Sequence, residues 1–157
     1  MHQVHQAFGL YHKNLIDYSA SLTGCREDAS ELVQDVFLSC IELAKRGELK
    51  LLTRPYLFCA VRNRSLSLLS RRSRLSNLWE DIKYHLQIIH VSHEVNTTLE
   101  TRIDALPKKY QEILSLRIRH ELSLAEIAVV AGIPVGTVKS RLNKAISLLK
   151  KQARINP

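Results

Sequence analysis

Apolar residues recur along the first third of the chain at alternating steps of three and four, the spacing of one helix face. The first stripe comprises Val4, Phe8, Tyr11, Leu15, Tyr18 and Leu22, and Gly24 follows it. A second helix is predicted from about Glu27 to Arg46, with an inner face of Ala29, Leu32, Val33, Val36, Phe37, Cys40 and Ala44. Pro55 suits the first turn of a third helix, whose inward residues are Leu57, Val61 and Leu68. These helices predict one small bundle.

The C-terminal third has stronger helix signals. Leu106 and Pro107 open a helix, and Ser123 with Glu126 forms a capping box before a short one. Gly132 ends the short helix. Pro134 and Val135 then begin a longer helix, whose inner face is formed by Val138, Leu142, Ala145, Ile146 and Leu149. Two helices around a glycine-containing turn predict a helix-turn-helix.

Between these parts the periodicity weakens. We therefore predict an all-α fold of two small helical domains: an N-terminal bundle of three to four helices over residues 1–74 and a C-terminal helix-turn-helix domain over residues 99–157. Residues 75–98 form the short linker that joins them.

Composition excludes several other classes. Apolar residues make up 45% of the 157 positions and charged residues 24%, which argues against a wholly disordered chain. No apolar run approaches the roughly 20 residues that span a membrane, and the N-terminus lacks the order of a signal peptide. We therefore expect a cytoplasmic protein. Its three cysteines form no Cys-x-x-Cys pair, and no third ligand accompanies the histidine pairs, so we expect buried thiols and no metal.

The net charge of +8 is unevenly placed. Two stretches, residues 49–79 and 127–157, contain no acid. Their cations are Lys50, Arg54, Arg62, Arg64, Arg71, Arg72 and Arg74 in the first, and Lys139, Arg141, Lys144, Lys150, Lys151 and Arg154 in the second. A solvated basic face would explain either stretch alone. Two such stretches, each on a motif, indicate two contacts with one polyanion.

The last helix has a polar face that suits DNA. Lys139, Ser140, Asn143 and Lys144 share one side by their i, i+4 spacing, opposite the apolar face of the helix. Near the N-terminal half of a helix, such side chains reach base edges and phosphates in a major groove. The alternative is an ordinary solvated surface, although no acid interrupts this face.

The C-terminal motifs resemble the promoter-binding domain of bacterial sigma factors. The matching residues run from Leu106 to Leu114, from Leu122 to Ala128, and from Gly132 to Leu142, with the specific run Val-Gly-Thr-Val-Lys-Ser-Arg. The resemblance implies that this domain reads the minus-thirty-five promoter element and contacts the flap of the second-largest polymerase subunit. The implied DNA-binding positions are Thr137, Lys139, Ser140, Arg141, Asn143 and Lys144.

The N-terminal half resembles the same family independently. Residues 28–38 are similar to the sigma helix that docks on the clamp of the largest polymerase subunit. Glu31, Gln34, Asp35 and Leu38 share one side of this helix and form a mixed acidic and apolar strip, which suits a basic partner helix. A merely solvated acidic face is the alternative.

Residues 55–63, followed by Arg71 and Arg72, resemble the helix that captures and melts the minus-ten element. Arginines can hold the backbone, an amide can bond a base edge, and an aromatic ring can stack on an unpaired base. Tyr56 stands where the family usually has Trp, and Ser67 where Asp is common. The implied residues are Tyr56, Arg62, Asn63, Arg64, Arg71 and Arg72.

Taken together, the sequence is identified as a member of the extracytoplasmic-function (ECF) group of sigma factors, because residues 2–74 and 99–152 carry the resemblance and leave no room for the domains of larger sigma factors. The resemblance implies a non-enzymatic protein without cofactor or small-molecule substrate. Its partners would be core RNA polymerase, promoter DNA and an anti-sigma factor, which could hold it at the inner membrane.

Two rivals remain at this point. A conventional dimeric helix-turn-helix regulator would need symmetric operator sites and leaves the strip on the second helix unexplained. An enzyme or adaptor acting on nucleic acid would need an acid/base or metal site, and neither basic stretch contains a carboxylate.

Overall fold

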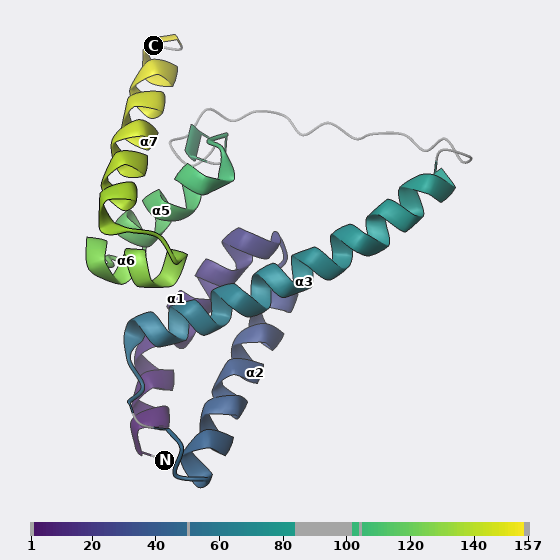
Figure 1. Ribbon diagram of the computed structural model, residues 1–157, viewed down its shortest axis with the longest axis vertical. Helices are drawn as coiled ribbons and strands as arrows, with labels where there is room; N and C mark the ends of the chain where they lie inside the picture. Colours follow the sequence, from purple (N-terminus) through teal and green to yellow (C-terminus); the bar gives the residue numbers. More distant parts are fainter. Residues whose placement is uncertain (1, 50, 84–101, 104, 156–157) are drawn as a thin grey trace.

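All secondary structure in the described part of the chain is α-helical. The computed structural model describes residues 2–49, 51–83, 102–103 and 105–155, without the side chains of 75–83 and 153–155. The helices are α1 (His2–Thr23), α2 (Arg26–Lys45), α3 (Arg54–Lys83), α5 (Lys108–Ile118), α6 (Leu124–Ala131) and α7 (Val135–Ile155), as Figure 1 shows. The prediction of an all-α fold is confirmed.

Helices α1, α2 and α3 pack around a common apolar core. Leu15 and Tyr18 of α1 and Val33 of α2 are completely buried in it. The turn after α1 and the turn after α2 contain Gly24 and Gly47, whose φ angles of 74° and 72° lie in the left-handed region that glycine adopts without a steric penalty. The predicted ends of the first two helices are therefore explained by local backbone chemistry.

The C-terminal domain has the predicted helix-turn-helix. Ser123 Oγ accepts a hydrogen bond from the backbone N–H of Glu126 at 3.2 Å, and the carboxylate of Glu126 accepts one from the N–H of Ser123 at 2.8 Å. This capping box begins α6, and Gly132, with φ 65°, ends it. Ile127 and Val138 from the two helices are fully buried. The predicted cap and turn are both present.

Some predicted core positions differ from the structure. Phe8 lies in the first apolar stripe, yet 43% of it is exposed, because it contacts Phe37 at the edge of the α1–α2 pair rather than entering the core. Leu68 is only partly buried. Helix α3 continues to Lys83, inside the segment predicted as the linker, and projects beyond the other helices (Figure 1). The linker prediction otherwise falls on residues 84–101, outside the described residues.

The two domains pack directly against each other. Helix α6 lies against α3, and one continuous apolar cluster runs from α1–α3 into the C-terminal domain (Figure 1). Phe58 marks the junction: its ring centroid lies 5.3 Å from that of Tyr18 in α1 and 5.3 Å from that of His120, which follows α5. Burying a side chain such as Phe58 contributes about 1.5–3 kcal/mol, so this contact is a substantial part of the interface.

His120 is buried among these aromatic rings. Only 4% of the residue is exposed, and within the described structure its Nδ1 has no hydrogen-bond partner. Burial lowers the pKa of His120 from 6.5 to about 4; the negative charge of Asp17 opposes this shift, and the positive charges of Arg119 and Arg54 add to it by smaller amounts. The imidazole is therefore neutral at pH 7, and protonating His120 would place a positive charge in a largely dehydrated part of the interface.

The pKa of His120 predicts a loss of stability in mild acid. Between pH 6.5 and 4 the unfolded chain binds a proton at this histidine that the folded chain does not, so the free energy of unfolding falls as pH decreases. From pH 7 to pH 5 we expect a decrease of about 2 kcal/mol, measured by urea unfolding with circular dichroism. His120→Phe should remove most of this dependence. An equal decrease in the variant would show that other groups cause it.

Candidate polymerase and promoter interfaces

The predicted polymerase-binding strip lies on the outer face of α2. Glu31, Gln34, Asp35 and Leu38 are all exposed, and 58% of Leu38 is accessible to solvent. Asp35 makes only a loose ion pair with Arg64, at 3.6 Å, and both partners are exposed, so this pair contributes little to stability. The strip is thus available to a partner.

A groove beside this strip was not predicted from the sequence. It has a volume of about 360 Å³ and is lined by Val4, His5, Phe8, Gln34, Phe37, Leu38 and Ile41. Because Phe8 and Leu38 come from different helices, the groove extends the apolar part of the strip across to α1. The sequence contains its lining residues Phe8, in the first apolar stripe, and Leu38, in the strip, but does not indicate that they meet.

The predicted minus-ten residues on α3 fall into two groups. Tyr56, Asn63 and Arg71 are exposed, and Tyr56 is 42% accessible. Arg62, Arg64 and Arg72 instead have partners within the chain: Arg64 donates a 2.6 Å hydrogen bond to Ser39 Oγ, and the other two bind carboxylates. Among these predicted residues, the helix therefore presents the Asn63 amide, the Tyr56 ring and Arg71 to solvent, while Arg62 and Arg72 are paired with carboxylates.

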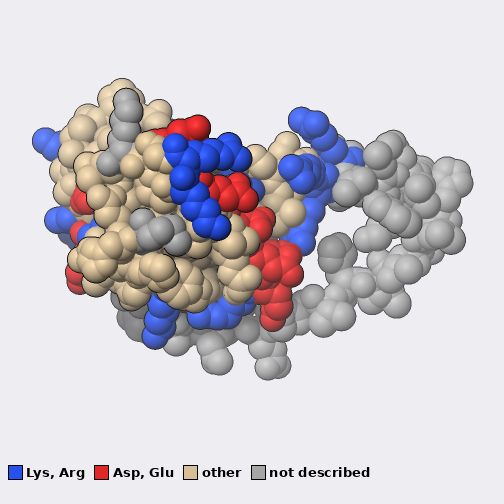
Figure 2. All heavy atoms as spheres, turned by 90° about the horizontal axis from the view of Figure 1, so that it is seen from below, with Lys and Arg blue, Asp and Glu red and all other residues tan. Residues whose placement is uncertain are grey.

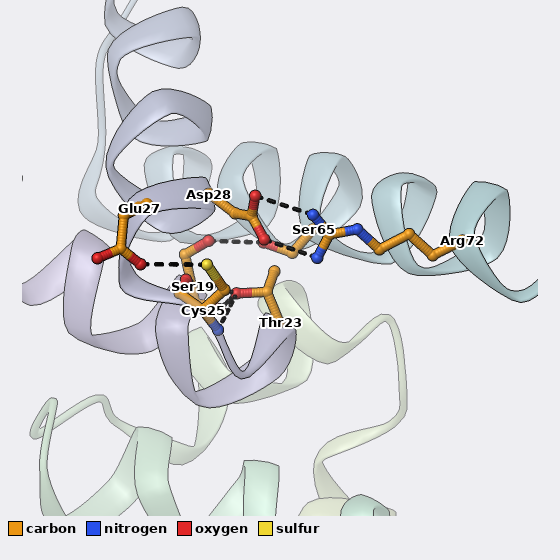
Figure 3. Close-up of polar contacts among 7 residues, drawn as sticks. All are labelled: Ser19, Thr23, Cys25, Glu27, Asp28, Ser65 and Arg72. Carbon is orange, nitrogen blue, oxygen red and sulfur yellow. Dashed lines mark hydrogen bonds and ion pairs between the residues drawn. The ribbon is translucent and has the colours of Figure 1, made fainter. Parts of the chain in front are cut away.

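Arg72 forms a bidentate ion pair with Asp28 at the start of α2. Its two terminal nitrogens lie 2.6 and 2.9 Å from the two carboxylate oxygens, and Figure 3 shows the guanidinium facing the carboxylate. The hydrogen bonds from Arg72 and, secondarily, from Cys25 lower the pKa of Asp28, and the same pair raises the pKa of Arg72. Beside it, the hydroxyls of Ser19 and Ser65 lie 2.9 Å apart and link α1 to α3 (Figure 3). These contacts fix the direction of the projecting half of α3.

Arg62 binds a carboxylate of the other domain. Its Nε lies 2.6 Å and its Nη2 3.3 Å from the two carboxylate oxygens of Glu112 on α5, and Tyr18 donates a 2.8 Å hydrogen bond to the same carboxylate. Both charged side chains are largely buried, at 21% and 13% exposure. The hydrogen bond to Glu112 raises the pKa of Arg62, and burial raises that of Tyr18. In this arrangement the guanidinium of Arg62 is not available to DNA.

The predicted DNA-reading face of α7 is exposed. Lys139, Ser140, Asn143 and Lys144 all point to solvent, while Val138 and Ala145 on the opposite side are fully buried. The face predicted from the spacing is therefore the accessible one. Its role in binding DNA stays a prediction at this point.

The two remaining predicted positions of α7 are partly buried. Thr137 accepts a 3.0 Å hydrogen bond from Ser140 Oγ at its carbonyl. Arg141 lines an interdomain cavity of about 500 Å³, together with Arg62 and Glu112. Arg141 therefore faces the N-terminal domain rather than the open face of α7, which the sequence did not indicate.

Charge on the surface is mixed rather than continuous. On the face seen in Figure 2, lysine and arginine side chains lie beside acidic ones, so the two basic stretches of the sequence do not merge into one basic surface there. Among the described residues, no group of three or more His, Cys, Asp or Glu side chains could hold a metal ion. None of the described helices is long and apolar enough to cross a membrane.

Comparisons with known families agree with this geometry. Residues 7–75 match the family described as sigma-70 region 2, and residues 97–149 match sigma-70 region 4. The first match contains the strip on α2 and the candidate minus-ten residues of α3; the second contains the helix-turn-helix. The chain belongs to the sigma-70 family, which is non-enzymatic, and within it to the ECF sigma factors.

The individual relatives that the chain resembles are also RNA polymerase sigma factors. The chain is 44% identical over 64 residues to the ECF RNA polymerase sigma factor SigW of Bacillus subtilis (strain 168), which covers 41% of this chain and 34% of SigW. It is 26% identical over 130 residues to SigV of the same organism, covering 81% and 76% of the two chains. It is 33% identical over 81 residues to HrpL of Pseudomonas syringae pv. syringae, covering 47% and 44%. The aligned parts of SigW and HrpL are thus less than half of those proteins.

Two solved structures share the fold over nearly the whole chain. The sigma factor RpoE, in complex with the anti-sigma factor NepR from Bartonella quintana, superposes with a TM-score of 0.70 at 22% identity, covering 97% of both chains. CnrH, in complex with the cytosolic domain of CnrY, superposes with a TM-score of 0.67 at 18% identity, covering 98% of this chain and 89% of CnrH. At these identities the likeness concerns the fold.

Proposed function

We propose that this protein binds core RNA polymerase and directs it to promoters that carry a minus-ten and a minus-thirty-five element. The observation that carries the proposal is the exposure of two separate polar faces, on α2 and α7, in a chain of the sigma-70 family. A conventional dimeric regulator would use α7 but has no use for the acidic and apolar strip on α2. Run-off transcription with purified core polymerase, with and without the protein, tests the proposal as a whole.

The α2 strip binds the clamp of the largest polymerase subunit. Asp35 and Glu31 supply negative charge, Leu38 supplies apolar contact, and the adjoining groove can take an apolar side chain of the partner. Complementary charge of this kind favours docking against a basic helix. The flap of the second-largest subunit binds the C-terminal domain.

The α7 face reads the minus-thirty-five element, and α3 acts at the minus-ten element. Lys139, Ser140, Asn143 and Lys144 reach base edges and phosphates from the exposed side of the recognition helix. On α3, Asn63 bonds a base extruded from the duplex and Tyr56 stacks on an unpaired one, while arginines bind the backbone.

An anti-sigma factor is the regulatory partner. Support comes from the two structural neighbours, both of which were solved in complex with a second protein, NepR or CnrY, over folds that match nearly this whole chain. A partner anchored in the inner membrane would place the inactive protein at that membrane and release it into the cytoplasm.

Reversing one charge in the strip should weaken the polymerase complex. Asp35→Arg places like charge against a basic partner, which costs several kcal/mol in a complementary interface, so the Kd for core polymerase should rise at least tenfold. Glu48→Arg makes the same charge change on an exposed residue outside α2 and serves as the control. Binding is measured by competition with a labelled sigma factor. If the folded Asp35→Arg variant competes as well as the control, the docking face lies elsewhere.

Removing an amide from α7 should alter promoter preference. Asn143→Ala should cost roughly 1–3 kcal/mol on the preferred minus-thirty-five sequence and relax the preference at one base position. Ser147→Ala, one turn further along α7, is the matched control. Holoenzyme binding to a set of single-base promoter variants measures both effects. A uniform loss over all sequences would assign Asn143 to a phosphate contact instead.

Asn63 should act in strand opening. Flipping a base costs a few kcal/mol, which the pocket that receives it must supply. Asn63→Ala should therefore lower the amount of open complex on duplex promoters, measured by permanganate reactivity of unpaired thymines, while polymerase affinity stays unchanged. A template already unpaired at the minus-ten element should restore much of the loss. Ser70→Ala, also exposed on α3, is the control; equal opening by both variants would remove Asn63 from the melting step.

A further inference from the structure

The interdomain cavity beside Arg62 has an apolar wall that none of the surfaces described above uses. Its volume is about 500 Å³, and four apolar side chains line it: Leu22 of α1, Leu66 and Leu69 of α3, and Ile103, which precedes α5. Pockets of roughly 300–1,000 Å³ with mainly apolar walls are typical small-molecule sites, and they occur preferentially at domain interfaces. The cavity thus has the size and the position of a ligand site.

The apolar part of the wall is aliphatic. Leu66 and Leu69 lie one turn apart on α3, and no aromatic side chain is among the described residues that line the cavity. Leu66 is 40% exposed, so a ligand that covered it would remove apolar surface from water. A flat aromatic ligand would gain no ring stacking from such a wall. The wall therefore suits a hydrocarbon chain.

The charge around the cavity is positive. Four cations line it: Lys108, Lys109, Arg119 and Arg141. Glu112 is the one acidic residue among the described lining residues, and it already forms an ion pair with Arg62. Lys108, Arg119 and Arg141 have no carboxylate partner within the described structure. An anionic headgroup is therefore the complementary one.

We propose that this cavity binds a free medium-chain fatty carboxylate. The hydrocarbon chain lies against Leu66, Leu69 and Ile103, and the carboxylate lies among Lys108, Arg119 and Arg141. A guanidinium suits this headgroup, because its paired N–H groups match the two carboxylate oxygens. The inference goes beyond the proposed function, and it does not rest on the assignment of any surface to polymerase or promoter.

The groove on α2 is the competing location for an apolar chain. Its lining includes Phe8, Phe37 and Leu38 but no lysine or arginine. A carboxylate bound there would have no cation in the wall to pair with, so the headgroup would add nothing to the affinity. Dependence on the headgroup charge therefore distinguishes the interdomain cavity from the groove.

Isothermal titration calorimetry of the full-length protein with decanoate, below the concentration at which micelles form, tests the proposal. We expect one site with a Kd on the order of 100 µM, and a thermal unfolding temperature that rises with decanoate concentration. Decyltrimethylammonium has the same chain with a positive headgroup, and acetate has the carboxylate without the chain. Both should bind roughly tenfold more weakly or worse, because each lacks one of the two complementary parts.

Two pairs of matched variants locate the ligand. Arg119→Gln should raise the Kd for decanoate about tenfold by removing one cation from the headgroup site. Arg46→Gln, which removes an exposed arginine outside the cavity, should leave the Kd unchanged. Leu66→Asn should also raise the Kd about tenfold by making the wall polar, whereas Leu10→Asn, at a 61% exposed leucine of α1, should not.

Several outcomes would overturn the proposal. Absence of both heat and a thermal shift at millimolar decanoate would do so, as would equal binding of decyltrimethylammonium. Loss of decanoate binding in Leu38→Asn but not in Leu66→Asn would place the chain in the groove on α2 instead. If Arg119→Gln and Leu66→Asn do not fold, Lys108→Gln, at the exposed first residue of α5, must weaken decanoate binding, and an unchanged Kd overturns the proposal.

Discussion

Phe58 is buried at the junction of the two domains, and the arrangement of the functional surfaces depends on its contacts. Its ring touches Tyr18 of the N-terminal bundle and His120 of the C-terminal domain, with both centroids at 5.3 Å. Because Phe58 belongs to the first turns of α3, the helix that carries Asn63 is part of both cores at once. The polar faces of α2 and α7 remain outside this shared core. Burial of the apolar start of α3 between the two domains thus leaves the polar faces of α2 and α7 exposed to solvent.

Around this apolar junction, two arginines of α3 bind carboxylates of other elements and so hold the helix in place. Arg72 binds Asp28 within the N-terminal bundle, whereas Arg62 binds Glu112 across the domain boundary. The first pair stays intact if the domains separate; the second cannot. The contact of Arg72 therefore lies within one domain, whereas the contact of Arg62 depends on how the two domains are positioned. His120 is buried in the same interface and is neutral there, so the packed interface disfavours its protonation.

Much of the candidate site was predictable from the sequence, because it lies on single helices. The strip of Glu31, Gln34, Asp35 and Leu38 and the α7 face of Lys139 and Asn143 follow from helical spacing alone, and each is exposed in the structure. The groove beside the strip was not predictable, because it combines Phe8 of α1 with α2. Nor was the orientation of Arg141, which depends on the neighbouring domain.

The sequence by itself determined the helices, most of their ends and the family, but not the end of α3 at Lys83. The cap at Ser123 and the turns at Gly24 and Gly132 arise from interactions within a few residues, which any copy of the local sequence would make. Only the tertiary structure decided that Arg62 meets Glu112, since these residues are 50 positions apart and carry no local signal of their pairing. It likewise decided that α6 covers α3. The spacing of apolar residues along one helix predicts that they will be buried, but it does not indicate which other helix they pack against.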